Sequence, residues 1–273
     1  MMASGARTVD VERALEQAAN SAKNGSPEAR SGQIGDAARI AKRILEEAQG
    51  ATSVWANWEA INDELIPDKD TSKAVKHLEL GALGVIRTAL LRDALLAAYR
   101  LSAPYKPNTV TLCTFVQLTA APTIAAKLGS EQWALDLGHH PRIAKHAMTE
   151  NARRVSRLHS IVVKDWTKSP PKDRKLLELR EAIKPVRDNF LAHSLDIEGV
   201  DHPIIDDIRH MIKLTLELAT DMAFVFLGSA VEADKFQEFC RERAAKFWQF
   251  AFQAPLEVYH TDMNRRREIG PGQ

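Results

Sequence analysis

The residues best suited to chemistry in this sequence are an arginine and a histidine near the end of one predicted helix. Arg187 and His193 lie near the end of the charged segment from Pro170 to Asp196, which begins at a proline pair. Arginine is permanently charged and can bind a phosphate through two parallel hydrogen bonds. Histidine is the side chain best suited to move protons near neutral pH. The pair therefore predicts a site that binds a phosphate and transfers a proton.

Spacing alone does not identify such a site, because Arg153 and Arg154 precede His159 at similar intervals. The order of residues around Arg187 is more specific. In RDNFLAHS, two polar residues follow the arginine, and three apolar residues precede the histidine. Upstream, the segment VIRTALLRDALLAAYRL is followed by a break containing Pro and Asn and then by an apolar helical segment.

This order of residues closely resembles the spaced Arg–His motif of the HEPN superfamily, a set of compact helical bundles that includes many metal-independent ribonucleases. The upstream segment is similar to the corresponding helix of the phage abortive-infection (Abi) subgroup. The resemblance covers about residues 55–250, and Asp196 stands one residue later than the acid in the commoner form of the motif. It implies an all-α bundle of the HEPN type with extra N-terminal helices. It also implies an endoribonuclease of phage defence or of a toxin–antitoxin system.

The resemblance implies a role for each residue of the motif. His193 would act as general base or acid on an RNA 2′-hydroxyl or on the 5′-oxygen leaving group. Arg187 would bind the scissile phosphate and stabilise its developing charge, and Asn189 or Asp188 would orient the histidine or the phosphate. Attack by a 2′-hydroxyl needs no metal, so no metal ligand and no cofactor are expected. Further candidates for substrate binding are Arg92, Arg100 and Ser194.

Helix geometry limits how one protomer can form the site. Six residues along an ideal helix leave Arg187 and His193 about 120° apart and about 9 Å apart along the axis. Asn189 and His193, four residues apart, share a face. Either Pro185 distorts the turn before Arg187, or two copies of the helix meet across a two-fold axis. The resemblance favours the second reading, and hence a homodimer with RNA as substrate.

Each candidate also has an ordinary structural reading. Arg187 can pair with an acid on a neighbouring helix while His193 caps the end of its own helix. Arg92, Asp93 and Arg100 lie in an apolar segment and can form core ion pairs or line a cleft near Arg187.

The second function considered is a catalytically inactive HEPN-like module that binds a partner protein or nucleic acid. An antitoxin or regulatory protein is a further partner. The basic stripe Arg153, Arg154, Arg157 and Lys164 can be a solvated face or part of an RNA-binding groove.

Composition is that of an ordinary globular protein. Of 273 residues, 45% are hydrophobic and 27% charged, and the net charge is +1, so nucleic-acid binding needs a local patch. Two cysteines, Cys113 and Cys240, cannot build a disulfide framework or a metal cage. There is no apolar run of about 18 residues and no signal-peptide pattern. These features predict a cytoplasmic protein that does not enter the membrane.

Apolar residues recur at helical spacing throughout the chain, and strand alternation is absent, so the sequence predicts an all-α bundle. We expect helices over residues 54–65, 73–101, 109–129, 142–166, 172–193, 206–227 and 232–254. Residues 1–50 are rich in Ala, Gly, Ser and charge and lack aromatic residues, which predicts a helical arm or a docking segment outside the core, with helices over residues 11–22 and about 36–49. Residues 51–255 are expected to form the HEPN-like bundle and residues 256–273 a disordered tail.

Overall fold

The protein is all-α over the residues that its computed structural model describes, which are 27–65, 81–103, 109–119, 122–166, 175–192 and 202–269. All regular secondary structure in these ranges is helical, as the hydrophobic spacing predicted. The helices are α2 (Pro27–Leu65), α4 (Gly81–Leu101), α5 (Leu112–Thr119), α6 (Pro122–Leu128), α7 (Glu131–Asp136), α8 (Pro141–Trp166), α9 (Lys175–Ala192), α10 (His202–Leu227) and α11 (Ala233–Ile269).

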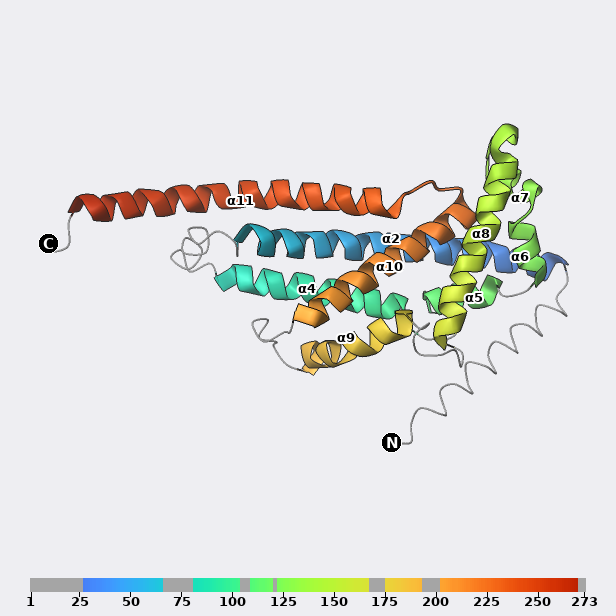
Figure 1. Ribbon diagram of the computed structural model, residues 1–273, viewed down its shortest axis with the longest axis horizontal. Coiled ribbons are helices and arrows are strands. Elements are labelled where there is room, and N and C mark those ends of the chain that lie inside the picture. Colours follow the sequence, from blue (N-terminus) through green and yellow to red (C-terminus); the bar gives the residue numbers. More distant parts are fainter. Residues whose placement is uncertain are drawn as a thin grey trace.

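Helix α2 is the central element of the bundle. It packs along α4 and α11 and is crossed by α10 (Figure 1). Trp55 is 1% exposed, and its ring stacks on that of Trp58 with the ring centroids 4.8 Å apart. The same hydrophobic core takes in Leu91 and Leu95 from α4 and Met222 from α10. The core therefore lies along α2, which α4, α5, α10 and α11 cover.

The prediction that residues up to 50 form an arm outside the core is wrong for the part that the structure describes. Helix α2 runs through residue 50 without interruption. Residues 1–26 lie outside the described residues. The composition misled because small side chains bury at little entropic cost and let a neighbouring helix approach closely. The buried side chains of this part of α2 are Ile34, Ala37, Ala41, Ile44, Leu45 and Ala48.

Helix α11 continues beyond the predicted end of the bundle. It is helical to Ile269, so the expected disordered tail from residue 256 is wrong up to that residue, and residues 270–273 lie outside the described part. Charged residues such as those in NRRREI have good helix propensity. Near its N-terminal end α11 is tied to the bundle through Glu59 of α2, whose carboxylate accepts hydrogen bonds from Arg209 Nε at 2.7 Å and Arg241 Nε at 3.3 Å.

The short helices α5, α6 and α7 gather beside α8 at one end of the molecule (Figure 1). The helix expected over residues 109–129 is divided into two, α5 and α6, and Pro122 is the first residue of α6. Proline is favoured at the first position of a helix because its missing N–H has no helical partner there. Among the described residues, no helix has both the length and the apolar character needed to cross a membrane.

Candidate functional site

Helix α9, which carries the predicted arginine, packs against α10, α8 and α4. Leu176, Ile183 and Val186 are buried at intervals of seven and three residues, so they form the inner face of the helix. The helix continues through Pro185 to Ala192. The predicted motif therefore begins in the last turns of α9. The inner face of this helix packs in the core.

Arg187 lies against the neighbouring helix α4. Its Cζ is 4.1 Å from the centroid of the Tyr99 ring, and its side chain is 21% exposed. Its Nε donates to Asp188 Oδ1 at 2.8 Å. A guanidinium above an aromatic face is attracted by the ring quadrupole. Arg187 is thus oriented by one ring and one carboxylate while part of it still meets solvent.

A second arginine, which the sequence analysis did not select, contacts the same ring. The Cζ of Arg180 lies 3.9 Å from the Tyr99 centroid, and its Nη1 donates to the backbone oxygen of Ser102 at 2.8 Å. Tyr99 is 8% exposed and belongs to the hydrophobic core. The signal in the sequence is the seven-residue interval between Arg180 and Arg187, which places both on one side of a helix.

The two arginines of α4 predicted to bind substrate have different surroundings. Both are exposed, so the reading of core ion pairs is wrong. Arg92 pairs with Asp93 at 3.5 Å and stands seven residues before Tyr99, hence on the same side of α4. Arg100 Nη2 lies 2.7 Å from Glu47 of α2, which holds it away from the side that carries Tyr99.

Three of the predicted site residues have no described side chain. His193 and Ser194 lie outside the described residues, and Asn189 lies in α9 with its side chain outside the description. The arrangement of Arg187 relative to His193 therefore stays a prediction. Among the side chains that the structure describes, no group of three or more His, Cys, Asp and Glu could hold a metal ion.

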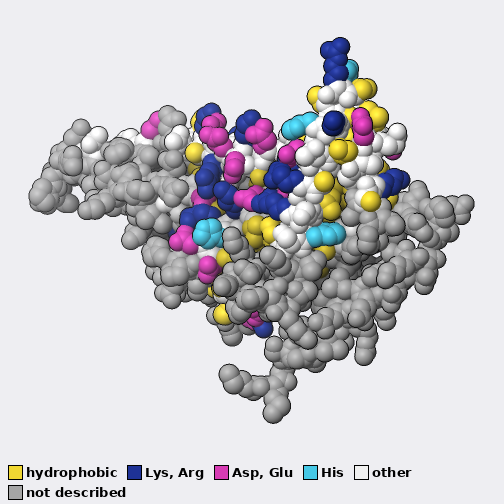
Figure 2. All heavy atoms as spheres, turned by 45° about the vertical axis from the view of Figure 1, so that its right-hand side comes forward, with side chains coloured by type: hydrophobic (Ala, Val, Ile, Leu, Met, Phe, Trp, Pro, Cys, Tyr) yellow, Lys and Arg dark blue, Asp and Glu magenta, His cyan; other side chains and the backbone are white. Residues whose placement is uncertain are grey.

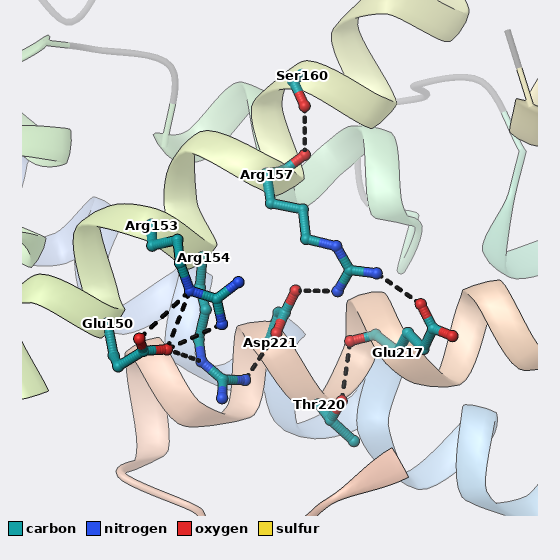
Figure 3. Close-up of polar contacts among 8 residues, drawn as sticks. All are labelled: Glu150, Arg153, Arg154, Arg157, Ser160, Glu217, Thr220 and Asp221. Carbon is teal, nitrogen blue, oxygen red and sulfur yellow. Dashed lines mark hydrogen bonds and ion pairs between the residues drawn. The ribbon is translucent and has the colours of Figure 1, made fainter. Parts of the chain in front are cut away.

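In the described part of the basic stripe of α8, Arg153 is exposed, whereas Arg154 and Arg157 are partly buried and pair with acids of α10. Arg154 Nη1 lies 2.7 Å from Asp221 Oδ1, and Arg157 Nη1 lies 2.6 Å from Asp221 Oδ2 (Figure 3). The Asp221 side chain, on α10, is only 6% exposed. Arg157 also contacts Glu217, and Arg153 pairs with Glu150 on its own helix.

These contacts match three arginines with three acids. A hydrogen bond from Arg153 lowers the pKa of Glu150, which keeps that carboxylate charged. Positive and negative side chains alternate over the described part of this face (Figure 2). The cluster therefore clamps α8 to α10 rather than offering free positive charge to a nucleic acid.

The second Arg–His match in the sequence is divided between two faces of α8. Arg154 faces α10, whereas His159 Nε2 lies 3.0 Å from Thr119 Oγ1 on α5. The Thr119 hydroxyl donates to the backbone oxygen of Phe115 or Val116, so it accepts from His159 Nε2–H. Burial lowers the pKa of His159 below 6.5, which favours the neutral ring. Arg154 and His159 therefore do not form a common site, and each makes a separate contact within the folded protein.

The lowered pKa of His159 predicts a pH dependence of stability. Because the folded pKa lies below the unfolded value of 6.5, the unfolded chain binds more protons between the two values. The contribution of His159 to the free energy of unfolding is therefore complete above pH 6.5, and it decreases as the pH falls toward the folded pKa. We expect wild type to lose more unfolding free energy than His159→Gln between about pH 7.5 and about pH 5, measured by urea unfolding. An equal loss in both proteins would contradict this.

Comparisons with known proteins give no relative of this chain. No family model, curated protein or solved structure matches it. What supports a function is therefore the chemistry of the side chains and their contacts.

Proposed function

We propose that this protein is a metal-independent endoribonuclease of the HEPN type that acts in phage defence or in a toxin–antitoxin system. The observation that carries the proposal is the setting of Arg187, which is held on Tyr99 beside Asp188 and is still 21% exposed. A guanidinium held in one orientation can bind phosphate without first being ordered. Six residues further along the chain is His193, the candidate for proton transfer.

The proposed reaction uses the RNA 2′-hydroxyl as nucleophile. His193 acts either as the base that takes the proton of the 2′-hydroxyl or as the acid that gives a proton to the departing 5′-oxygen, and water makes the other proton transfer. The 2′-oxygen attacks the phosphorus and the bond to the 5′-oxygen breaks, which leaves a 2′,3′-cyclic phosphate and a 5′-hydroxyl. Arg187 stabilises the charge that develops on the phosphate oxygens. The phosphate competes with Asp188 for the guanidinium, and Asp188 keeps Arg187 oriented when no substrate is bound.

We propose that the site is completed by a second copy of the chain. Arg187 and His193 are about 120° apart on a regular helix, so one α9 does not direct both at a single phosphate. Two α9 helices related by a two-fold axis can supply the arginine and the histidine from different protomers. In such a dimer Asn189, one helical turn before His193, orients the histidine or the phosphate.

The test is cleavage of total RNA and of a tRNA pool by the purified full-length protein, with and without EDTA, beside His193→Ala. We expect cleavage by the wild type to survive EDTA, because no metal takes part. We expect the His193→Ala protein to be folded and to cleave nothing. Cleavage that persists in His193→Ala, or that EDTA stops, would rule out the mechanism.

A catalytically inactive module that binds a partner protein is the second candidate, and one surface favours it. Phe239, Phe247 and Phe250 of α11 are 52%, 58% and 77% exposed. The three residues lie within about 80° of one another around the helix, so they share one side, and exposed apolar patches are common where another molecule binds. Absence of cleavage by the wild type would favour this candidate.

A further inference from the structure

We propose that Arg180, Lys184 and Arg187 form a track on α9 that binds the phosphate backbone of single-stranded RNA. The inference rests on the proposed function, whose substrate it describes further. The three residues are spaced at four and three, so they lie within about 60° of one another around the helix. They span about 10.5 Å along its axis. We call this row the cationic track.

The charges of α9 are divided between two sides of the helix. The cationic track lies between the buried face and an outer acidic side. Lys184 Nζ is 4.0 Å from Glu181 Oε2, the limit for an ion pair, and its side chain is 41% exposed. A polyanion would therefore follow the edge of α9 nearest α4 and avoid the outer side. The acids of that outer side are Glu178, Glu181 and Asp188.

The ends of the cationic track are held by one aromatic ring. Arg180 and Arg187 each lie near 4 Å from the Tyr99 centroid, so no more than about 8 Å separates the two Cζ atoms. The Tyr99 ring is part of the core, and Ser102 Oγ donates a hydrogen bond to the backbone oxygen of Tyr99 at 3.0 Å. Ordering long side chains on binding costs about 0.5–1.5 kcal/mol for each one. Because Arg180 and Arg187 are already held on Tyr99 in the free protein, phosphate binding orders them at a lower entropic cost.

The length of the cationic track selects the class of ligand. Phosphates repeat every 3.4 Å along the axis of a duplex strand and further apart in an extended strand, so a row whose end charges are no more than about 8 Å apart faces about two of them. A mononucleotide could use only one contact. The cationic track is one side chain wide, so it contacts the backbone of one strand. Positively charged grooves that bind single strands also follow one backbone. The ligand is therefore a single-stranded RNA several nucleotides long, with the strand leading toward Arg187.

The test measures RNA binding separately from cleavage. The probe is a labelled oligouridylate of about 20 nucleotides, longer than the site of about 4–16 nucleotides that single-strand-binding domains cover. All proteins are full-length and carry His193→Ala, so that the probe stays intact. Lys184→Gln is the main variant, because the Lys184 side chain is 41% exposed and its ion pair with Glu181, on the same helix, is at the 4.0 Å limit. Arg180→Gln is the second. Lys213→Gln is the matched control, because Lys213 is 47% exposed and pairs with Asp234 of α11.

Salt dependence gives the expected result as a number. Each phosphate contact contributes about 0.7 to the slope of log K against log salt for a single strand. We expect Lys184→Gln and Arg180→Gln each to reduce the slope by about 0.7 and to weaken binding about fourfold at about 0.15 M salt. Lys213→Gln should leave both quantities unchanged.

The outcomes separate the two proposals. An unchanged slope in Lys184→Gln, or an equal loss in Lys213→Gln, would overturn the cationic track. If wild type cleaves RNA while Lys184→Gln binds normally, the nuclease proposal stands and the track fails. If the slope falls as expected while wild type cleaves nothing, the track stands and the nuclease proposal fails.

Discussion

An Asp221→Ala variant is expected to lose about 3 kcal/mol of unfolding free energy, near the low end of the about 3–5 kcal/mol seen when one partner of a buried ion pair is removed. Asp221 is the shared partner of Arg154 and Arg157, and its side chain is 6% exposed. Without it, two guanidinium groups at the contact between α8 and α10 lose a hydrogen-bonded carboxylate. The low end applies because the Arg157 side chain is still 34% exposed and can reach water.

Urea unfolding at neutral pH measures this effect as a lower midpoint with an unchanged slope. Glu150→Ala is the control, since it removes a partner of Arg153, whose side chain is 59% exposed, and a longer contact of 3.6 Å to Arg154, which keeps Asp221. Exposed ion pairs contribute about 0–1 kcal/mol. If Asp221→Ala and Glu150→Ala lose the same free energy, the clamp between α8 and α10 does not depend on Asp221. A second check replaces both arginines by apolar residues in Asp221→Ala, which should recover part of the loss.

An Arg187→Lys variant is expected to cleave RNA about 10²–10³-fold more slowly than wild type, by analogy with the loss of one donor that stabilises a developing oxyanion. Lysine keeps the positive charge but cannot offer two parallel N–H groups to a phosphate. It also lacks the planar group that lies 4.1 Å from the Tyr99 centroid in wild type. The decrease should appear in kcat, because the arginine acts on charge that develops in the transition state.

Single-turnover cleavage of a defined RNA with excess enzyme separates this loss from weaker binding. Arg153→Lys is the control, because Arg153 is exposed and pairs with Glu150 on α8, away from α9. Its rate should match that of the wild type. The unfolding free energy of Arg187→Lys should change by only about 0.5–1 kcal/mol, the size of an exposed cation–π contact. If Arg187→Lys cleaves within a few-fold of the wild-type rate, Arg187 is not the phosphate ligand.

The helices themselves were largely predictable, because helix formation depends on local spacing and local stop signals. Apolar residues at intervals of three and four gave α8 and α10 nearly at their observed bounds. Prediction failed where composition was used in place of spacing. Residues 36–49 were expected to be helical but to lie outside the core, because of their composition, although Ala37, Ala41 and Ala48 follow the same helical interval and are buried.

Arg187 was chosen from its neighbours in the chain, but the rest of its surroundings could not be predicted from them. Asp188 adjoins it in sequence, and their contact is local. Tyr99 lies on α4, far away along the chain, and nothing in either segment shows that α4 and α9 pack together. Arg180 was overlooked for the same reason: its role depends on the ring that it shares with Arg187.

The sequence by itself predicted the helices that the described residues form, and it singled out Arg187 and His193 as candidates for phosphate chemistry, which stays a prediction. Only the tertiary structure decided which charges are already matched. Arg154 and Arg157 look as free as Arg187 in the sequence, yet they share Asp221, which is more than 60 residues away along the chain. The physical reason is that an ion pair depends on distance in space, which helix packing sets, whereas helical periodicity depends only on distance along the chain.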